Sequence, residues 1–228
     1  RETFMTQRLA TPPIAGQPSM KMTSSGNPLP NTKIRVVDAD FNDLPNRSVG
    51  EIAVQSDCML TEYFNRPDAT EAAIKNLPAQ GGGDGSGSIV KSGWYLTGDY
   101  GYIADGELYV SGRKKDLIIV GGKNVYPQDL ESLASEVNGV HKGRTVAFGM
   151  YDEEEGTEEV VIIAEADSAS PSEMEAIADA IRKHVTKSSA IALRHVKVVD
   201  DKWIIKTSSG KTARSANKEK FLKEAGMV

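Results

Sequence analysis

The sequence predicts an α+β protein in two parts, a β-rich first part followed by a small α+β second part. Short runs of alternating apolar and polar residues, separated by turn residues, recur in the first part and predict a small β-rich unit or barrel. From Pro127 onward the patterns follow the order helix, strand, strand, helix, strand, helix, which predicts a compact α+β domain.

In the first part, residues 1–32 contain five prolines and many hydroxyl side chains, so little regular structure is expected there. Strands are expected at Lys33–Asp38, Val49–Gln55 and Glu107–Val110. The glycine- and serine-rich run at 81–88 is typical of a flexible linker. A phosphate-binding loop is the alternative interpretation, but no strand–glycine–helix context surrounds the run.

In the second part, Ser170 and Glu173 have the spacing of a capping box and open a predicted helix. This helix carries its acidic residues early and its basic residues late, which suits the helix dipole. An apolar run at Leu117–Val120 precedes the first helix of this part. The other expected elements are a helix at Pro127–Val137, strands at Thr145–Gly149, Glu159–Glu165 and Arg194–Val199, and a closing helix at Arg214–Glu224.

Composition excludes several functional classes. A net charge of −5 argues against a chain that mainly coats nucleic acid or an anionic membrane. The sequence contains no run of 18 or more apolar residues, so no membrane span is expected. The single cysteine, Cys58, cannot form an internal disulfide; it fits either a reducing compartment, from which we expect a cytoplasmic location, or a thiol without a role. The three histidines lie far apart and lack metal-site spacing. Because the chain begins at Arg1 and not at Met, we expect a piece of a longer protein.

Three motifs could carry chemistry: Tyr95–Asp99, Gly112–Pro127 and Lys206–Lys211. A carboxylate such as Asp99 can accept two ribose hydroxyls, but it can equally cap a turn. Arg113 can pair with phosphate or with a nearby acid. The Ser-Gly-Lys-Thr tail is similar to the end of a Walker A loop, but Ile205 stands where that motif needs glycine. Lys211 therefore lies on a hydroxyl-rich loop that either reaches an anionic substrate or is simply solvated.

In this order and spacing, the motifs resemble those of the acyl-adenylate-forming, AMP-binding superfamily, over nearly the whole chain. Further segments that match are Ser25–Asn31 with Ile34–Asp38, Val49–Val54, and Tyr63–Pro67 with Thr70. The Asn124–Glu131 and Lys206–Lys211 stretches are most similar to the fatty-acyl branch, which includes fatty-acyl-CoA synthetases and fatty-acyl-AMP ligases. The resemblance implies a distorted β-barrel remnant of the large adenylation domain over 1–114, followed by a mobile α+β C-terminal lid domain over 115–228.

The resemblance also implies a role for each matching residue. Asp99 would hold the ribose hydroxyls of ATP and of the acyl-adenylate, and Arg113 would contact the ribose or phosphate side. Lys115 matches the hinge at which the lid rotates between the two half-reactions, and the flanking Lys-Lys-Asp supplies free backbone rotation and solvent access. Gly122 matches the glycine that lines a pantetheine tunnel, and Lys211 the lysine that stabilises charge during adenylation.

The chain departs from the family pattern in a few places. Arg1 stands where the family has Thr before the Mg²⁺-binding glutamate, so Glu2 is either that metal ligand or a frayed terminal acid. Ile204-Ile205 stand where Pro is common, from which we expect a local loop change with little effect on Lys211. The phosphate-binding loop of the type S-G-T-T-G-x-P-K and the acyl pocket are absent, which implies the C-terminal portion of the enzyme.

The function implied is that of an ATP- and Mg²⁺-dependent acid–thiol ligase of fatty acid metabolism. It would activate a carboxylic, fatty-type acid as acyl-AMP and pass the acyl group to CoA or to the phosphopantetheine of an acyl carrier protein. The alternative is a non-catalytic carrier-docking or regulatory module derived from the family. Lys211 discriminates between the two, because a docking module has no need of it.

Overall fold

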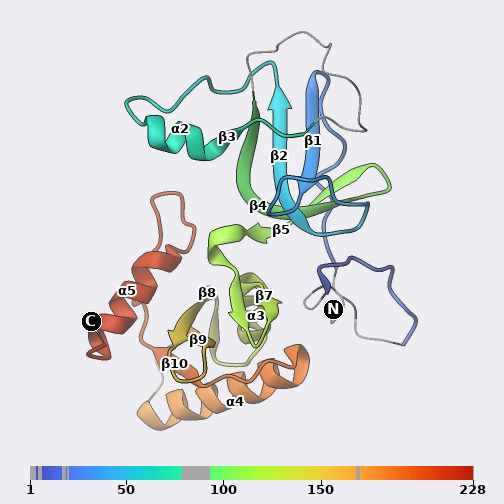
Figure 1. Ribbon diagram of the computed structural model, residues 1–228. Coiled ribbons are helices and arrows are strands. Elements are labelled where there is room, and N and C mark those ends of the chain that lie inside the picture. Colours follow the sequence, from blue (N-terminus) through green and yellow to red (C-terminus); the bar gives the residue numbers. More distant parts are fainter. Residues whose placement is uncertain are drawn as a thin grey trace, which may run out of the picture. The chain divides into compact units, whose positions relative to one another are not determined.

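The computed structural model describes residues 4, 7–16, 19, 21–78, 93–167 and 170–227. The chain divides into two compact units, Arg1–Lys115 and Asp116–Val228 (Figure 1). The boundary expected from the sequence lies one residue earlier, between positions 114 and 115. No helix in the described ranges is long and apolar enough to cross a membrane.

The first unit is built on a five-stranded sheet in the order β1-β2-β4-β3, with β5 also paired to β4. All of its strand pairs are antiparallel. One short helix, α2, lies between β2 and β3 along the chain. The elements are β1 (Thr32–Val37), β2 (Gly50–Ser56), α2 (Pro67–Ala73), β3 (Ile74–Lys75), β4 (Trp94–Ala104) and β5 (Glu107–Arg113). The β-rich first part that the sequence predicts is thus confirmed.

The β4–β5 hairpin positions the first motif. Its two-residue turn, Asp105-Gly106, has φ values of 54° and 85°. Positive φ at both central residues is the type I′ geometry, whose twist matches that of the strands and which Asp-Gly favours. Behind the turn, Tyr102 and Tyr109 face each other across the ladder and stack with ring centroids 4.9 Å apart. The hairpin is therefore held at its turn and by an aromatic pair in which Tyr102 is buried and Tyr109 half-buried.

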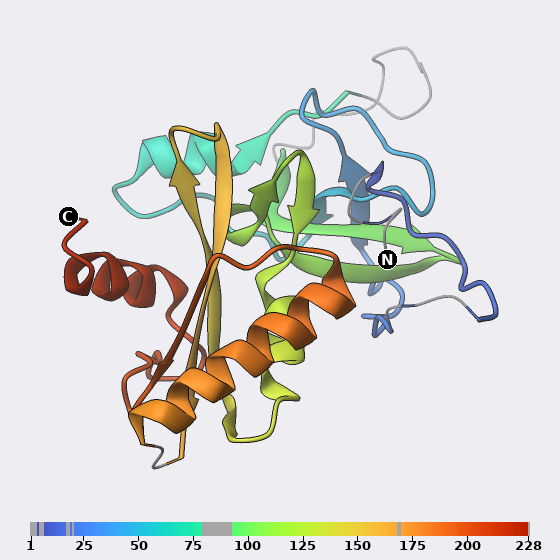
Figure 2. The ribbon, with the colours of Figure 1, turned by 90° about the horizontal axis from the view of Figure 1, so that it is seen from below.

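The second unit is a three-stranded sheet in the order β10-β9-β8, in which β9 and β10 are parallel and β8 and β9 antiparallel. The parallel pair is joined by a crossover through α4, as parallel strands require. Figure 2 shows α4 on one side of the sheet and α5 on the other. The elements are β6 (Ile118–Val120), β7 (Lys123–Val125), α3 (Pro127–Ser135), β8 (Val140–Asp152), β9 (Thr157–Ala166), α4 (Pro171–Ser189), β10 (His195–Val199) and α5 (Arg214–Glu224).

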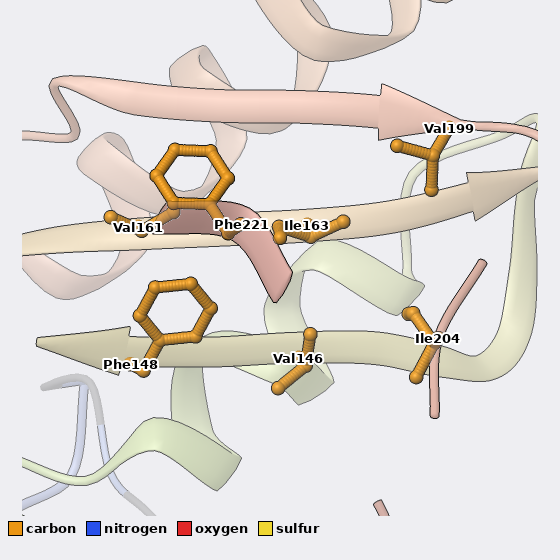
Figure 3. Close-up of a cluster of buried hydrophobic side chains, with 7 residues drawn as sticks. All are labelled: Val146, Phe148, Val161, Ile163, Val199, Ile204 and Phe221. Carbon is orange, nitrogen blue, oxygen red and sulfur yellow. The ribbon is translucent and has the colours of Figure 1, made fainter. Parts of the chain in front are cut away.

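The core on the α5 side of this sheet comes from alternate residues of the strands. Phe221 of α5 packs into a cluster of strand side chains and meets Phe148 edge to face, with centroids 5.8 Å apart (Figure 3). The other members of the cluster are Val146, Val161, Ile163, Val199 and Ile204. Since Ile204 belongs to the segment that leads into the Lys206–Lys211 motif, this core anchors the start of that motif.

The predicted elements of the second unit are confirmed in type and order. The capping box at Ser170 and Glu173 forms, and α5 has the bounds expected from the sequence. Three elements of the first unit escaped sequence reasoning: α2, the two-residue strand β3 and the long strand β4. In β4, Gly98 has a φ of 72° and interrupts the alternation that marks a strand. The apolar run at Leu117–Val120 contains β6, which forms a short hairpin with β7.

Candidate functional site

Asp99 and Arg113 are direct partners in the register of β4 and β5. Nε of Arg113 lies 3.7 Å from Oδ1 of Asp99, and the two side chains are 62% and 37% exposed. The backbone at this position is held by Thr97, whose Oγ1 donates to the Ile52 carbonyl at 2.9 Å and accepts from the Asp99 N–H at 3.1 Å. The two residues that the sequence singled out are therefore brought together at a fixed place on the sheet.

This arrangement suits a ribose phosphate. Within the described part of the chain, the Asp99 carboxylate has only the long contact with Arg113, so both of its oxygens can accept hydroxyls of a diol. The Arg113 guanidinium beside it presents donors to phosphate or ribose oxygens. An acceptor pair next to a cationic donor is what a nucleotide with a free diol requires.

A hydrogen bond between two tyrosines links another family-like segment to the first motif. The hydroxyls of Tyr63 and Tyr95 lie 3.1 Å apart, and this bond raises the pKa of Tyr95. Tyr63 is held in turn by Thr70, whose Oγ1 accepts its N–H at 2.9 Å. Ile74 of β3 pairs with Tyr95 of β4, so both ends of the Tyr63–Ile74 segment meet Tyr95. No sequence pattern indicated this tyrosine pair.

Lys115 is an exposed residue between two anchored neighbours. Lys114 Nζ lies 2.7 Å from Oε2 of the buried Glu51, a hydrogen bond that raises the pKa of Lys114. Asp116 Oδ2 accepts from Arg214 Nη1 at 2.6 Å. Residues 114–116 form one turn of 3₁₀ helix, so the free backbone expected for Lys-Lys-Asp is restricted to a short turn whose flanks are each tied to their own unit.

Gly122 lies at the tip of the β6–β7 hairpin. Gly121 and Gly122 have φ values of 53° and 77°, again the type I′ pattern. Both are exposed, and a Cβ added at Gly122 would meet no heavy atom within 4 Å among the atoms described. The glycine is thus required by the turn geometry, while the space beside it is open to a thin ligand.

Lys211 lies on the returning arm of a tight loop between β10 and α5. Its carbonyl accepts the Thr207 N–H at 2.8 Å and its own N–H donates to Thr207 Oγ1 at 3.2 Å. Gly210, with a φ of 80°, closes the loop by donating to the Thr207 carbonyl at 2.8 Å. Lys211 is exposed, and its Nζ has no ion-pair partner in the described residues. The loop therefore presents an unpaired ammonium group on an ordered backbone.

Sequence reasoning missed Arg214, the first residue of α5. Its guanidinium donates to the Ala147 carbonyl at 2.9 Å, to Asp116 at 2.6 Å and to Glu131 Oε1 at 2.7 Å. Glu131 Oε1 also accepts the Ala147 N–H at 2.9 Å. Arg214 thus joins the start of the second unit, α3 and β8 to the helix that follows the lysine loop. The only sequence signal was its position three residues after Lys211.

Two sequence expectations fall on residues outside the described ranges, namely Glu2 as a Mg²⁺ ligand and the Gly81–Ser88 run as a linker. In the ranges that are described, no group of three or more His, Cys, Asp or Glu side chains could hold a metal ion. The Mg²⁺ ligand and the linker therefore stay expectations from the sequence.

Comparison with known proteins gives the same assignment. No family model matches, but a long-chain-fatty-acid–AMP ligase of Mycolicibacterium smegmatis is 32% identical over 210 residues, which is 82% of this chain and 33% of that protein. A structure of fatty acyl-adenylate ligases from E. coli and L. pneumophila matches 99% of this chain and 37% of its own, with a TM-score of 0.79 at 25% identity. The McyG A-PCP structure with phenylalanyl-adenylate matches 90% and 34%, with a TM-score of 0.74 at 30% identity.

The chain spans about a third of the length of the curated relatives it matches. The relatives and the solved structures agree with the motifs and with the fold of both units. On this evidence the chain belongs to the AMP-binding, acyl-adenylate-forming superfamily and is most similar to its fatty-acyl-CoA synthetases and fatty-acyl-AMP ligases.

Proposed function

We propose that this chain is the C-terminal part of an ATP-dependent acid–thiol ligase. The whole enzyme activates a carboxylic acid of the fatty-acid class as acyl-AMP, releases pyrophosphate, and transfers the acyl group to a pantetheine thiol. The observation that carries the proposal is the pairing of Asp99 with Arg113 on adjacent strands, with the carboxylate accessible. The matched relative named as a fatty-acid–AMP ligase supports this acid class.

In this proposal Asp99 accepts the two ribose hydroxyls of ATP and then those of the acyl-adenylate. Arg113 donates to the ribose or phosphate side of the same nucleotide. During adenylation, Lys211 places its ammonium group beside the carboxylate that attacks and the α-phosphate that is attacked, where negative charge develops. Mg²⁺ would neutralise phosphate charge, with Glu2 as its proposed ligand.

The two units then take two roles. We assign Arg1–Lys115 to the end of the large AMP-binding domain and Asp116–Val228 to a lid that rotates about Lys115. The ion pairs of Lys114 and Asp116 support this hinge, because they leave Lys115 as the residue between two anchored neighbours. In the rotated state, the open space at Gly122 would admit the thin pantetheine arm of CoA or of a carrier protein.

We also propose a cytoplasmic location. Cys58 is exposed and has no disulfide partner, which suits a reducing compartment.

The decisive test separates the two half-reactions in the full-length ligase. Lys211→Ala should lower the rate of adenylation by about 10²–10³-fold, because a charge-stabilising group has been removed. Thioester formation from supplied acyl-adenylate should be spared. Lys202→Ala, at another exposed lysine close to the loop, is the matched control and should leave both rates unchanged. Equal loss of both half-reactions in Lys211→Ala would contradict the role.

The 228-residue chain alone should show no ATP–pyrophosphate exchange, since the phosphate loop and acyl pocket are absent from its sequence. Robust exchange by this chain would overturn the assignment to a C-terminal part. Binding of a loaded carrier protein by a full-length protein that catalyses neither half-reaction would instead favour the docking module.

A further inference from the structure

The lysine loop begins and ends at one buried amide side chain, that of Asn217 on α5. Oδ1 of Asn217 accepts the Ile205 N–H at 2.8 Å, and its Nδ2 donates to the Ile205 carbonyl at 2.9 Å and to the Ala213 carbonyl at 2.8 Å. The residue has an exposed fraction of 0%. Asn217 therefore binds the residues on both sides of the loop that runs from Lys206 to Thr212.

A second buried polar side chain holds the preceding residue. Oε1 of Glu165, on β9, accepts the Ile204 N–H at 2.6 Å, and this carboxylate is 1% exposed. Nε of Arg144 lies 3.6 Å from its other oxygen. The backbone N–H groups of Ile204 and Ile205, at the start of the loop, thus donate to two buried side chains from different elements. The start of the loop cannot shift without leaving one of these buried groups unpaired.

Backbone hydrogen bonds between the two arms of the loop connect this base to Lys211. The Ala213 N–H donates to the Ile205 carbonyl at 3.0 Å, and Lys206 and Thr212 form an antiparallel bridge one step further along. The Thr207–Lys211 hydrogen bond is the next rung of this small ladder. Each rung fixes the next, so the position of the Lys211 backbone depends on the spacing that Asn217 sets between Ile205 and Ala213.

We infer that Asn217, assisted by Glu165, is a positioning residue for Lys211: it holds the base of the loop at the width that presents the lysine ammonium to the reacting carboxylate and α-phosphate. The inference rests on the proposed role of Lys211 in adenylation. Asparagine suits this task because it offers an acceptor and two donors on one short side chain, and the geometry uses all three. Aspartate would keep the acceptor for Ile205 and lose both donors.

The first experiment measures the loop itself in the 228-residue chain, without any reaction. Backbone amide hydrogen exchange by NMR should speed up at Ile205, Thr207 and Lys211 in Asn217→Ala, by about 10-fold or more relative to amides of α4, because the local opening becomes easier. The matched control is Ser189→Ala, which removes another buried side-chain hydrogen bond of the same unit, to the Val185 carbonyl. That control should leave exchange in the loop unchanged.

The second experiment uses the full-length ligase. Asn217→Ala should lower kcat of adenylation by about 10–100-fold, as expected when a catalytic group is misplaced by about 1 Å, with the KM for ATP changed far less. Thioester formation from supplied acyl-adenylate should stay at the rate of the unmodified enzyme. If Asn217 had a merely structural role, Asn217→Ala would reduce both half-reactions together. Ser189→Ala is again the control, and a general loss of folded protein in that variant would likewise reduce both half-reactions together.

The outcomes separate this inference from the proposed function. If exchange in the loop is unchanged in Asn217→Ala, or if both half-reactions fall equally, the positioning role is wrong. If Lys211→Ala leaves adenylation intact while Asn217→Ala still loosens the loop, the proposed function fails. The hydrogen bonds of Asn217 then stabilise the loop without any role in catalysis. If Asn217→Ala does not fold, Asn217→Asp decides by the same two measurements.

Discussion

Nη1 of Arg214 lies 2.6 Å from Oδ2 of Asp116, although 98 residues separate them in the chain. Asp116 directly follows the proposed hinge residue Lys115, and Arg214 follows Lys211 by three positions. Both side chains are 19% exposed. The ion pair therefore connects the residue at which the second unit begins with the helix that carries the lysine loop, so that the two are expected to move as one body.

Arg214→Lys tests how much this connection stabilises the second unit. The guanidinium serves two carboxylates and a carbonyl at once, whereas an ammonium group cannot reproduce the planar fork. We expect urea unfolding of the 228-residue chain to show a loss of about 2 kcal/mol, the scale of a hydrogen bond to a charged group. Arg182→Lys, in an exposed pair with Asp179, should change stability by less than about 0.5 kcal/mol. Equal effects in the two variants would contradict this role.

Asp99→Ala should weaken nucleotide binding while leaving the fold intact. The carboxylate is partly exposed and has one long contact, so its removal costs little stability, but two hydrogen bonds to the ribose are lost. We expect the KM for ATP of the full-length ligase to rise by about 10–100-fold, which corresponds to one or two bonds to a charged group. Asp57→Ala, at an exposed position elsewhere in the first unit, is the control and should leave the KM unchanged.

Lys115→Pro should impair the second half-reaction more than the first. Proline fixes φ and removes the N–H at the residue between the two anchored flanks, so rotation of the lid is restricted. Lys115→Ala keeps backbone freedom and should retain both rates, which separates the backbone from the side chain. Single-turnover rates for adenylation and for thioester formation check this prediction. Normal rates for both steps in Lys115→Pro would argue against a hinge at this residue.

Much of the second unit could be predicted because its signals are local. A capping box indicates the start of helix α4, and α5 is a helix of eleven residues with the expected bounds. The strand β4 was missed because Gly98 interrupts the alternation that identifies a strand. The hairpin of β6 and β7 was missed in part because its strands have only three residues each.

The candidate site shows the same division. Asp99, Arg113 and Lys211 lie in contiguous motifs, so the sequence alone could single them out. Arg214 and Asn217 act through partners that are remote in the chain or on the backbone, and such contacts leave no periodic or compositional mark. The residues proposed to carry chemistry were thus easier to find than the residues proposed to hold them in place.

Phe221→Ala should destabilise the second unit strongly. The ring is buried in the cluster of Figure 3 against Phe148, and truncation leaves a cavity between α5 and the sheet. Large-to-small changes of this kind cost about 3–5 kcal/mol. Leu222→Ala, at a neighbouring and only partly buried position, should cost clearly less. Denaturant unfolding of the 228-residue chain measures both, and a small effect at Phe221 would mean that α5 is not held by this core.

The capping box of α4 should make that helix sensitive to acid. The Ser170 hydroxyl, followed by the Ser170 N–H at 2.7 Å, lowers the pKa of Glu173 below its usual 4.5. Because the folded-state pKa is lower than the unfolded one, the stabilisation is present above pH 4.5 and is lost as the pH falls through the folded-state value. Ser170→Ala should move the pKa of Glu173 upward, measured by NMR titration of its carboxyl carbon. Glu175→Gln, two residues further along the same helix, should leave that titration unchanged. If the Ser170 variant titrates as the unmodified chain does, the hydroxyl is not what holds the Glu173 carboxylate ionised, and the Ser170 N–H and the helix N-terminus must account for the lowered pKa.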